Sequence, residues 1–487
     1  MMKSQIAILG AGPAGLALGM KLLRRSDLHS DVVIIDLKPC VGGLAASFER
    51  DGLYFDHGSH RLHPATSAEV LTDIRALLGP DLLERPRNGR ISLLGRLVKF
   101  PLNPVDLALH LPFSFMSGFT WDMVSRPLRK KHQLHTSFAD ALLDGLGKTI
   151  CQEFYFPYAR KLWGLNPEDI SVVQAHKRVS ANNLSKMLAK VFSFIPGIRQ
   201  EGAGRFYYPV KGYGQISEAL AQEVKRLGGH IHLSTVVHEI RIQPGQKIKL
   251  LSAPASLSEN GAPANKRTQP EVLEAEFVFV TIPITTLVQL IRPEPPAEVT
   301  QAAQSLRFRA MVLHYLIVEA DHFTPYDAHY FPGEEVIFSR LSEPKNYSAA
   351  HEPQGLTGLC FEIPCQVGDH IWRASEEELT HRVKEEMEKV HLPITFPIRT
   401  SLSRHIPHVY PIYDTNFALH FQLVDTYLAT IPGVIPLGRQ ALFAHDNTHH
   451  TMEMAYRACE CLQPDLSWDA VRWQQYRQAF EKHVVVD

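Results

Sequence analysis

The feature that most constrains the fold is a Gly-x-Gly-x-x-Gly pattern at residues 10–15, close to the start of the chain. A short apolar run, Gln5–Leu9, precedes it, and a stretch with helical spacing, Pro13–Arg25, contains its second half. Another apolar run follows at Val32–Ile35. This order predicts a strand, a tight turn, a helix and a second parallel strand, which together form the βαβ unit of an open parallel sheet.

The pattern also predicts what the turn binds. Gly10 permits the tight turn, Gly12 lets the backbone approach a pyrophosphate, and Gly15 allows close contact between helix and strand, with Ala14 between them. An acid, Asp36, ends the second strand about 20 residues later, where its carboxylate can accept hydrogen bonds from a ribose diol. The unit therefore predicts a dinucleotide site.

Composition excludes several other classes of protein. The 487 residues are 45% hydrophobic and 21% charged, as in globular proteins, and the net charge of −1 gives no general attraction to nucleic acid. Six cysteines form no disulfide framework and suit a cytoplasmic location. No apolar run is long enough to predict a transmembrane helix. The most apolar segment, Leu107–Phe119, could touch a membrane surface, but a buried or lid segment is the preferred interpretation.

Periodicity places further elements along the chain. Helices are expected at Ile216–Arg226, Glu376–Val390 and from Thr448 to Leu462, and a helix-rich region is expected between about 110 and 200. The segment Gln243–Pro270 is rich in Pro, Ser, Gly and Asn, which predicts an exposed hairpin tip or a disordered insertion. Strands are expected at five places: Ile231–Ile240, Phe277–Thr281, Val312–Val318, Gly358–Ile363 and Val434–Leu437.

Three segments resemble flavoproteins of the amine-oxidase type. The run from Asp36 to Ser47 contains a Gly-Gly pair ending at Gly43, as in the segment that follows the ribose acid in that family. Val237 stands in a segment that resembles the strand holding the adenine, and Gly438-Arg439 resembles the segment that closes over the flavin. The resemblance implies FAD, and because no counterpart of the flavin-linking cysteine is present, it implies non-covalent binding.

The wider resemblance is to the protoporphyrinogen-oxidase and amine-oxidase superfamily, and within it to proteins similar to UDP-galactopyranose mutase. It rests on six segments, which occur in the family's order: Asp56–His63, Phe100–Asn103, Tyr158–Gly164, Lys177–Val179, Ser339–Glu343 and Tyr410–Ile412. The implied catalytic residues are His60 and His63, and the implied substrate-binding residues are Arg178, Arg340, Tyr410 and His445. For each arginine the alternative is a structural ion pair, with Glu343 as the candidate partner of Arg340.

The implied fold class is α/β: a Rossmann-type FAD-binding domain with a parallel sheet, interleaved with an α+β substrate domain and a helical subdomain. The predicted division assigns 1–65, 212–290 and 428–487 to the FAD-binding domain, 66–110 and 291–427 to the substrate-binding domain, and 111–211 to the helical subdomain.

One departure from the mutase pattern ranks the possible functions. Phe443 and His445 stand where the mutases have tyrosines that hold a diphosphate. This favours an FAD-dependent oxidoreductase acting on a small polar or glycan-like substrate, with an anionic substrate as one option, over a non-redox nucleotide-sugar mutase. A non-enzymatic escort protein on the same fold is the third reading. His445, His449 and His450 resemble a metal cluster, but without an acid or cysteine at ligand spacing no metal is expected.

Overall fold

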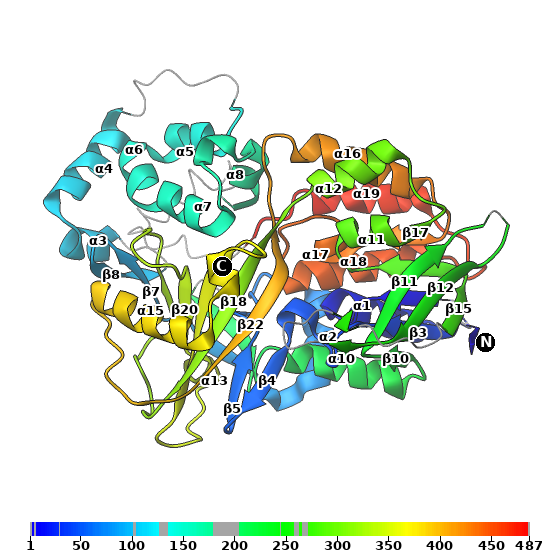
Figure 1. Ribbon diagram of the computed structural model, residues 1–487, viewed down its shortest axis with the longest axis horizontal. Helices are drawn as coiled ribbons and strands as arrows, with labels where there is room; N and C mark the ends of the chain where they lie inside the picture. The colour runs from blue at the N-terminus through cyan, green and yellow to red at the C-terminus, as the bar shows by residue number, and fades with distance from the viewer. Residues whose placement is uncertain are drawn as a thin grey trace.

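The computed structural model of the protein describes residues 2–3, 6–28, 30–100, 104–125, 135–178, 204–243, 245–257, 263–264 and 271–485. Two groups of elements lie beside each other (Figure 1). One is built around two five-stranded sheets and the other around a seven-stranded sheet, with a group of helices above it.

The predicted βαβ unit lies at the centre of a parallel sheet. Strands β2 (Ile6–Leu9) and β3 (Val32–Ile35) pair in parallel and are fully buried, and α1 (Pro13–Leu23) connects them. The sheet order is β10-β3-β2-β16-β23, with parallel pairing throughout. The other three strands, β10 (His230–His232), β16 (Phe277–Val280) and β23 (Val434–Pro436), come from distant parts of the sequence. The predicted α/β class with a parallel sheet is confirmed.

The single strand predicted at Ile231–Ile240 is wrong. The chain breaks at Ser234, which has a φ of 48°, so β10 ends before it and β11 (Thr235–Arg241) begins after it. Strand β10 joins the parallel sheet, whereas β11 joins the second five-stranded sheet. The sequence of this segment cannot reveal such a change of sheet, because both halves are strand-like in composition.

The second sheet also corrects the prediction of a hairpin tip or disordered insertion over Gln243–Pro270. Within that segment β12 (Ile248–Pro254) is a regular strand that pairs antiparallel with β11 and with β15 (Glu271–Ala275). Its Ile248 and Leu250 are buried in the core, which explains why the strand forms. The sheet is completed by β1 (Met2–Lys3) and β17 (Ile291–Arg292), and β13 (Ser256–Leu257) pairs with β14 (Pro263–Ala264) beside it. Residues 244, 258–262 and 265–270 of the segment lie outside the described residues.

The seven-stranded sheet has the order β22-β18-β21-β20-β19-β7-β8. Its central strands β18 (Phe308–Val318) and β21 (Thr357–Cys365) are almost wholly buried, and helix α15 (Glu376–Lys389) packs Leu379, Val383 and Met387 into the same core. The remaining strands are β22 (Ile398–Pro411), β20 (Arg340–Ser342), β19 (Ala328–Tyr330), β7 (Gly89–Leu93) and β8 (Arg96–Phe100). Two small antiparallel pairs complete the strands: β4 (Ser47–Arg50) with β5 (Leu53–Asp56), and β6 (Leu82–Pro86) with β9 (Arg205–Pro209).

Helices surround the sheets (Figure 1). Those around the five-stranded sheets are α1, α2 (Ala68–Leu78), α10 (Gln215–Arg226), α11 (Ile284–Leu290), α12 (Ala297–Ser305), α16 (Phe417–Ala429), α17 (Gly438–Ala441), α18 (Thr448–Cys461) and α19 (Ala470–Phe480). Beside the seven-stranded sheet lie α3 (Pro104–His110), α4 (Phe113–Ser125), α5 (Phe138–Leu146), α6 (Lys148–Ile150), α7 (Phe156–Trp163), α8 (Val172–Arg178), α13 (Pro344–Ser348) and α14 (His370–Arg373). Among the described residues no helix combines the length and apolar character needed to cross a bilayer.

The interleaving of chain segments follows from these sheets. The parallel sheet takes strands from near residues 6, 33, 231, 278 and 435, while the chain between them builds the seven-stranded sheet and the helices above it. The residue boundaries of the three predicted domains stay a prediction.

Candidate functional site

The glycine turn is held by protein contacts at two of its three glycines. Gly10 has a φ of 108°, and a Cβ there would lie 2.2 Å from the Oγ1 of Thr281, which donates a hydrogen bond to the Leu9 carbonyl at 2.9 Å. A Cβ at Gly15 would lie 2.0 Å from the Gly10 carbonyl oxygen. At Gly12, in contrast, a Cβ would meet no protein atom within 4 Å. Packing therefore requires Gly10 and Gly15, whereas the space in front of Gly12 is open for a ligand.

The other predicted cofactor glycines meet this turn from elsewhere in the sequence. The Gly42 N–H donates to the Ala11 carbonyl at 2.8 Å, and a Cβ at Gly43 would lie 3.5 Å from the Gly12 Cα. From the other end of the chain, a Cβ at Gly438 would lie 3.0 Å from the Cβ of Ala14. Three segments remote in sequence thus converge on the N-terminus of α1, where unpaired N–H groups and the helix dipole favour an anion.

Asp36 lies beside the turn, at the end of β3. One carboxylate oxygen accepts the Ala11 N–H at 2.7 Å and the other accepts the Lys38 N–H at 2.8 Å. Burial raises the pKa of this carboxyl, and the two hydrogen bonds oppose that rise. Because a carboxylate has about four acceptor positions, it keeps the capacity to accept from a ribose diol.

Val237 and Arg439, the other two residues implied to bind the cofactor, belong to β11 and α17. The pairing of β11 with β12 shifts register between Val237 and Glu239, so the ladder bulges where an adenine is expected. The Arg439 guanidinium donates to the carbonyls of Asp446 and Val409, each at 2.9 Å, and lies over the ring of Tyr410. Arg439 therefore fixes the chain that follows α17.

His60 is held by backbone carbonyls. Its Nε2 lies 2.9 Å from the Leu44 oxygen and 3.0 Å from the His57 oxygen, so Nε2 carries a proton, and the ring stacks on Tyr213. Burial lowers the pKa of His60, so the imidazole is neutral at pH 7. The backbone carbonyls and Tyr213 therefore hold the His60 ring in place. The Nδ1 of His63 accepts the Ala65 N–H at 2.9 Å.

Arg340 is paired within the protein. Its guanidinium makes a two-point contact with Glu362, at 2.9 and 2.7 Å, and the same carboxylate accepts the Ser59 N–H at 2.6 Å. Both side chains are largely buried, at 16% and 3% exposure. Sequence reasoning missed Glu362, because an acid in the apolar run of β21 gives no sign of its partner. The hydrogen bond from Ser59 joins the loop that contains His60 to the seven-stranded sheet.

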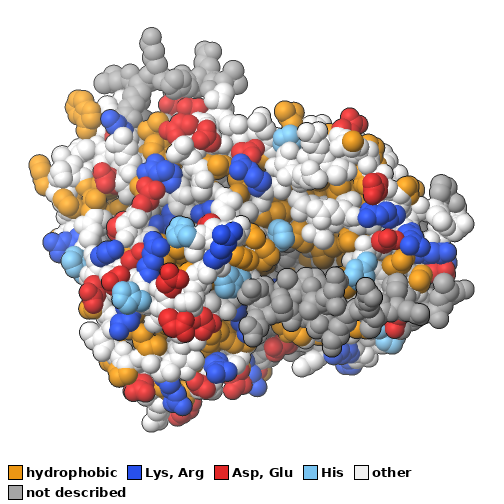
Figure 2. All heavy atoms as spheres, viewed as in Figure 1, with side chains coloured by type: hydrophobic (Ala, Val, Ile, Leu, Met, Phe, Trp, Pro, Cys, Tyr) orange, Lys and Arg blue, Asp and Glu red, His pale blue; other side chains and the backbone are white. Residues whose placement is uncertain are grey.

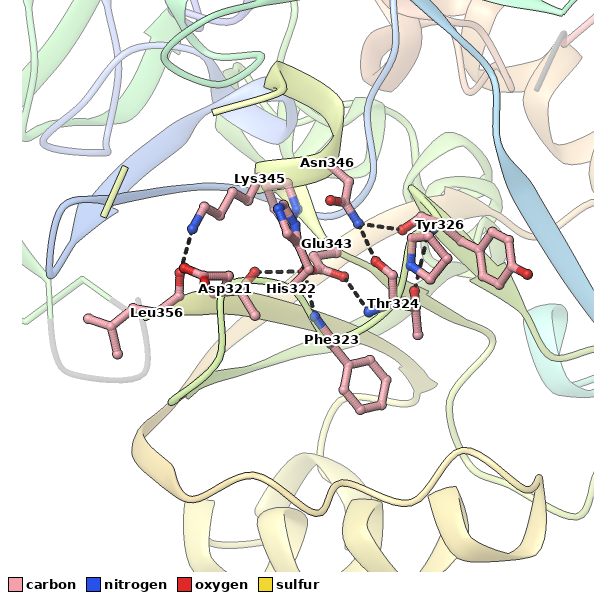
Figure 3. A network of polar contacts seen from close by, with 12 residues as sticks. Asp321, His322, Phe323, Thr324, Tyr326, Glu343, Lys345, Asn346 and Leu356 are labelled. Carbon is pink, nitrogen blue, oxygen red and sulfur yellow. Dashed lines mark hydrogen bonds and ion pairs between the residues drawn. The ribbon is translucent and has the colours of Figure 1, made fainter. Parts of the chain in front are cut away.

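Glu343, the partner suggested for Arg340 from sequence, makes different contacts (Figure 3). Its carboxylate accepts the N–H groups of Phe323 and Thr324, at 2.9 and 3.2 Å, and the Thr357 hydroxyl at 2.7 Å. Burial raises the pKa of this carboxyl. Glu343 therefore shapes a loop of the seven-stranded sheet, and the suggested pairing with Arg340 is wrong.

Tyr410 and His445 do lie close together, with ring centroids 6.1 Å apart, and the His445 ring meets Tyr413 edge-on at 4.8 Å. Phe443 is 2% exposed and packs against Phe308 and Tyr413. Arg178 ends α8, and its side chain lies outside the described residues, as do Pro101, Leu102 and Asn103.

A second buried acid that the sequence did not identify anchors the same loop. Asp56 ends β5 and is 1% exposed. It accepts the hydroxyls of Ser47 and Tyr208, at 2.6 and 2.7 Å, and the Tyr213 N–H at 2.8 Å. Burial raises the pKa of its carboxyl. Asp56 directly precedes His57 in sequence, and this position could have identified it as an anchor of the loop.

The expectation of no metal rested on the lack of an acid or cysteine at ligand spacing in the sequence, and the fold brings an acid to the histidines. The structure brings Asp446 together with His450 and His483, whose Nδ1 atoms lie 3.5 and 3.3 Å from its carboxylate. The ring centroids of the two imidazoles lie 4.2 Å apart, with an interplanar angle of 13°. His450 Nδ1 also accepts the Asn447 N–H at 3.3 Å, which caps α18. One ligand atom from each of the three side chains lies within 4.8 Å of the others, which is close enough for them to share a cation.

Two surface hollows of the seven-stranded part, of about 280 and 310 Å³, lie away from the glycine turn. Arg85, Asn88 and His322 line the first, and residues 92–95 with Gln152 line the second. Neither contains a residue predicted to bind the cofactor.

These features define an α/β protein with a glycine turn between a buried strand and a helix, an acid at the end of the next strand, and open space at Gly12. The family model described as flavin containing amine oxidoreductase matches residues 13–459. The chain therefore belongs to this family, which implies a flavin cofactor and supports an enzymatic role. Among curated proteins none matches this sequence.

Solved structures share the fold at low identity. Reduced UDP-galactopyranose mutase has a TM-score of 0.79 at 17% identity, with 99% of this chain and 100% of that one covered. A protein from Exiguobacterium sp. 255-15 assigned as a protoporphyrinogen oxidase has a TM-score of 0.68 at 18% identity, with 93% and 98% covered. Putrescine oxidase bound to putrescine has a TM-score of 0.63 at 14% identity, with 94% and 98% covered. The predicted family resemblance is confirmed, and at these identities the likeness concerns the fold alone.

Proposed function

We propose that the protein is an FAD-dependent oxidoreductase that oxidises a small polar or glycan-like substrate and holds FAD non-covalently. The observation that carries the cofactor proposal is the open space at Gly12 between two glycines that packing requires. Bound flavin would supply the redox chemistry by accepting two electrons from the substrate. Gly10, Gly12, Gly43 and Gly438 would surround its phosphates, and Asp36 would hold its ribose.

The position of Phe443 supports an oxidoreductase over a mutase. Its ring is buried among Phe308, Tyr413 and Phe417, so no hydroxyl replaces the tyrosine expected to hold a diphosphate. Arg340, one of the two arginines implied to bind the substrate, is engaged by Glu362. A substrate without a diphosphate accounts for both observations.

His60 and the residues around it would orient the substrate. Its Nε2–H is committed to two carbonyls, so the ring can only position neighbouring groups or accept through Nδ1. Tyr410 and His445 would form the polar, aromatic part of the pocket wall. This arrangement suits a small substrate held by hydrogen bonds and ring contacts.

The test is anaerobic photoreduction of the purified protein, followed by mixing with oxygen and by a search for substrate-dependent bleaching of the flavin. We expect yellow protein that releases intact FAD on acid treatment and is reduced by small amines, alcohols or sugars without a nucleotide. A colourless protein would favour the escort alternative. Turnover of a nucleotide sugar after prior reduction, without net use of reductant, would replace the proposal with the mutase function.

A further inference from the structure

The helices α3 and α4 present an apolar face to the outside of the molecule. Leu109, Phe113, Trp121 and Val124 are 76%, 86%, 70% and 67% exposed. Both helices lie at the outer edge of the helical group, and hydrophobic spheres gather at that edge (Figures 1 and 2). Isolated exposed apolar residues are ordinary, but four large ones in two adjacent helices mark an interaction surface.

The charges of this segment are distributed in the opposite way from those of a helix that faces water. Its two acids, Asp106 and Asp122, are 9% and 6% exposed. They accept the backbone N–H groups of Lys99 and Thr149, at 2.7 and 2.6 Å. A helix in contact with water usually turns its charges outward and its large apolar groups inward. Here the carboxylates are inside and Phe113 and Trp121 are outside.

The inner side of the same helices is anchored in the core. Leu107, Leu111 and Phe115 are 6%, 6% and 4% exposed and belong to the largest apolar cluster. The outer residues of α4 carry no formal charge, as they are Phe113, Ser114, Ser117, Thr120, Trp121 and Val124. The segment read from sequence as buried or lid-like therefore has two apolar sides, of which one remains uncovered.

The sequence next to this face indicates what covers it. Directly after α4 the chain continues with Arg126, Arg129, Lys130 and Lys131, whose positions lie outside the described residues. A basic stretch that follows in sequence an apolar helix face with a tryptophan is a combination found in proteins that lie on anionic bilayers. With a net charge of −1 for the whole chain, the attraction must be local.

We propose that the outer face of α3 and α4 docks this protein on the surface of a bilayer that contains anionic lipids, with Phe113, Trp121 and Val124 inserted at the headgroup boundary. The uncharged surface of α4 can enter this layer without burying an ion, and the hydroxyls of Ser117 and Thr120 remain near the polar boundary. The contact lies on one face, so no segment crosses the membrane.

The experiment is flotation of the flavin-loaded protein with vesicles of phosphatidylcholine, with and without phosphatidylserine. We expect binding to the anionic vesicles that weakens as salt rises. The double variant Phe113→Ser with Trp121→Ser should bind about a hundredfold or more weakly, because each side chain contributes about tenfold or more when it leaves water. Ser117→Asp, which adds a charge and removes no packing, should also abolish binding.

The matched control is Leu419→Ser with Val471→Ser, which removes side chains 70% and 73% exposed elsewhere on the molecule and should leave vesicle binding unchanged. Circular dichroism and flavin content check that every variant is folded. The proposal is overturned if the anionic vesicles do not bind, if the control variant loses binding equally, or if the α4 variants bind as well as the parent. Self-association that α4 substitutions abolish, without vesicle binding, would assign the face to a second copy of the chain.

Discussion

The glycine turn and the region around Glu362 differ in how far protein contacts account for their residues. At the turn, packing accounts for Gly10 and Gly15 but leaves open space at Gly12. Around Glu362, a carboxylate and a guanidinium of opposite charge are matched at hydrogen-bond distance, and the same carboxylate holds the Ser59 N–H. The first region leaves space that no protein atom fills at Gly12, whereas the charged groups of the second are paired with each other.

This difference shows how to separate ligand-binding residues from scaffold. A residue type that no protein contact explains, such as Gly12, points to a ligand. A charged residue whose partner lies in the protein, such as Arg340, is explained without one, even where its sequence segment resembles a substrate-binding segment. Four measurements test the comparison.

The largest effect is expected at the glycine turn. Gly12→Val should give protein with almost no flavin, because the new side chain fills the space that a pyrophosphate needs. Its φ of −79° and open surroundings mean that the variant should fold and melt like the flavin-free parent protein. Flavin absorbance and a melting curve check both points. Gly15→Val is the contrasting variant, in which folding itself should fail. Full flavin content in Gly12→Val would show that the open space does not serve the cofactor.

The second measurement concerns the completed region. Arg340→Met leaves the Glu362 carboxylate buried without its partner and should lower the free energy of unfolding by about 3–5 kcal/mol without any substrate present. Arg307→Met is the control, since its pair with Asp414 is exposed at 49% and 23% and should contribute about 0–1 kcal/mol. Denaturant unfolding measures both. Unchanged stability of Arg340→Met, with weaker substrate binding, would return Arg340 to the role of anchor.

The third measurement concerns Asp36, the acid expected to hold the ribose of the cofactor. Asp36→Ala removes the expected acceptor of the ribose hydroxyls and should cost about 1–3 kcal/mol of FAD affinity, which is roughly tenfold to a hundredfold in the dissociation constant. Fluorescence titration of the apoprotein measures it, with the exposed Asp31→Ala as the control. An affinity equal to that of the parent would remove Asp36 from the site.

The smallest effect depends on pH and concerns His57, which lies next to the Gly-Gly pair. Burial lowers the pKa of His57 from 6.5 to about 3. Between these two pH values the unfolded chain therefore binds a proton at His57 that the folded chain does not. Its contribution therefore destabilises the fold as pH falls, by about 1 kcal/mol between pH 7 and 5.5. Unfolding of His57→Asn in the flavin-free Gly12→Val background should lack this part of the acid sensitivity. The control His381→Asn changes a side chain 75% exposed and should retain it.

The sequence alone determined the dinucleotide unit, because its information is local. Strand, turn, helix and ribose acid lie within residues 6–36, and the positions of β3 and α1 agree with the predicted ranges to within two residues. The family resemblance is also carried by short segments in order. Such features follow from backbone geometry and hydrophobic periodicity, which neighbouring residues decide.

Only the tertiary structure decided which polar groups are already satisfied. Arg340 and Glu362 are 22 residues apart in sequence and meet across β20 and β21, while Asp446 and His483 meet between the end of α17 and the chain after α19. Whether β10 and β11 belong to one sheet or two was likewise decided by strand pairing over long distances. Burial, pKa and ion pairing depend on what packs against a residue from all sides, and a linear sequence does not contain those neighbours.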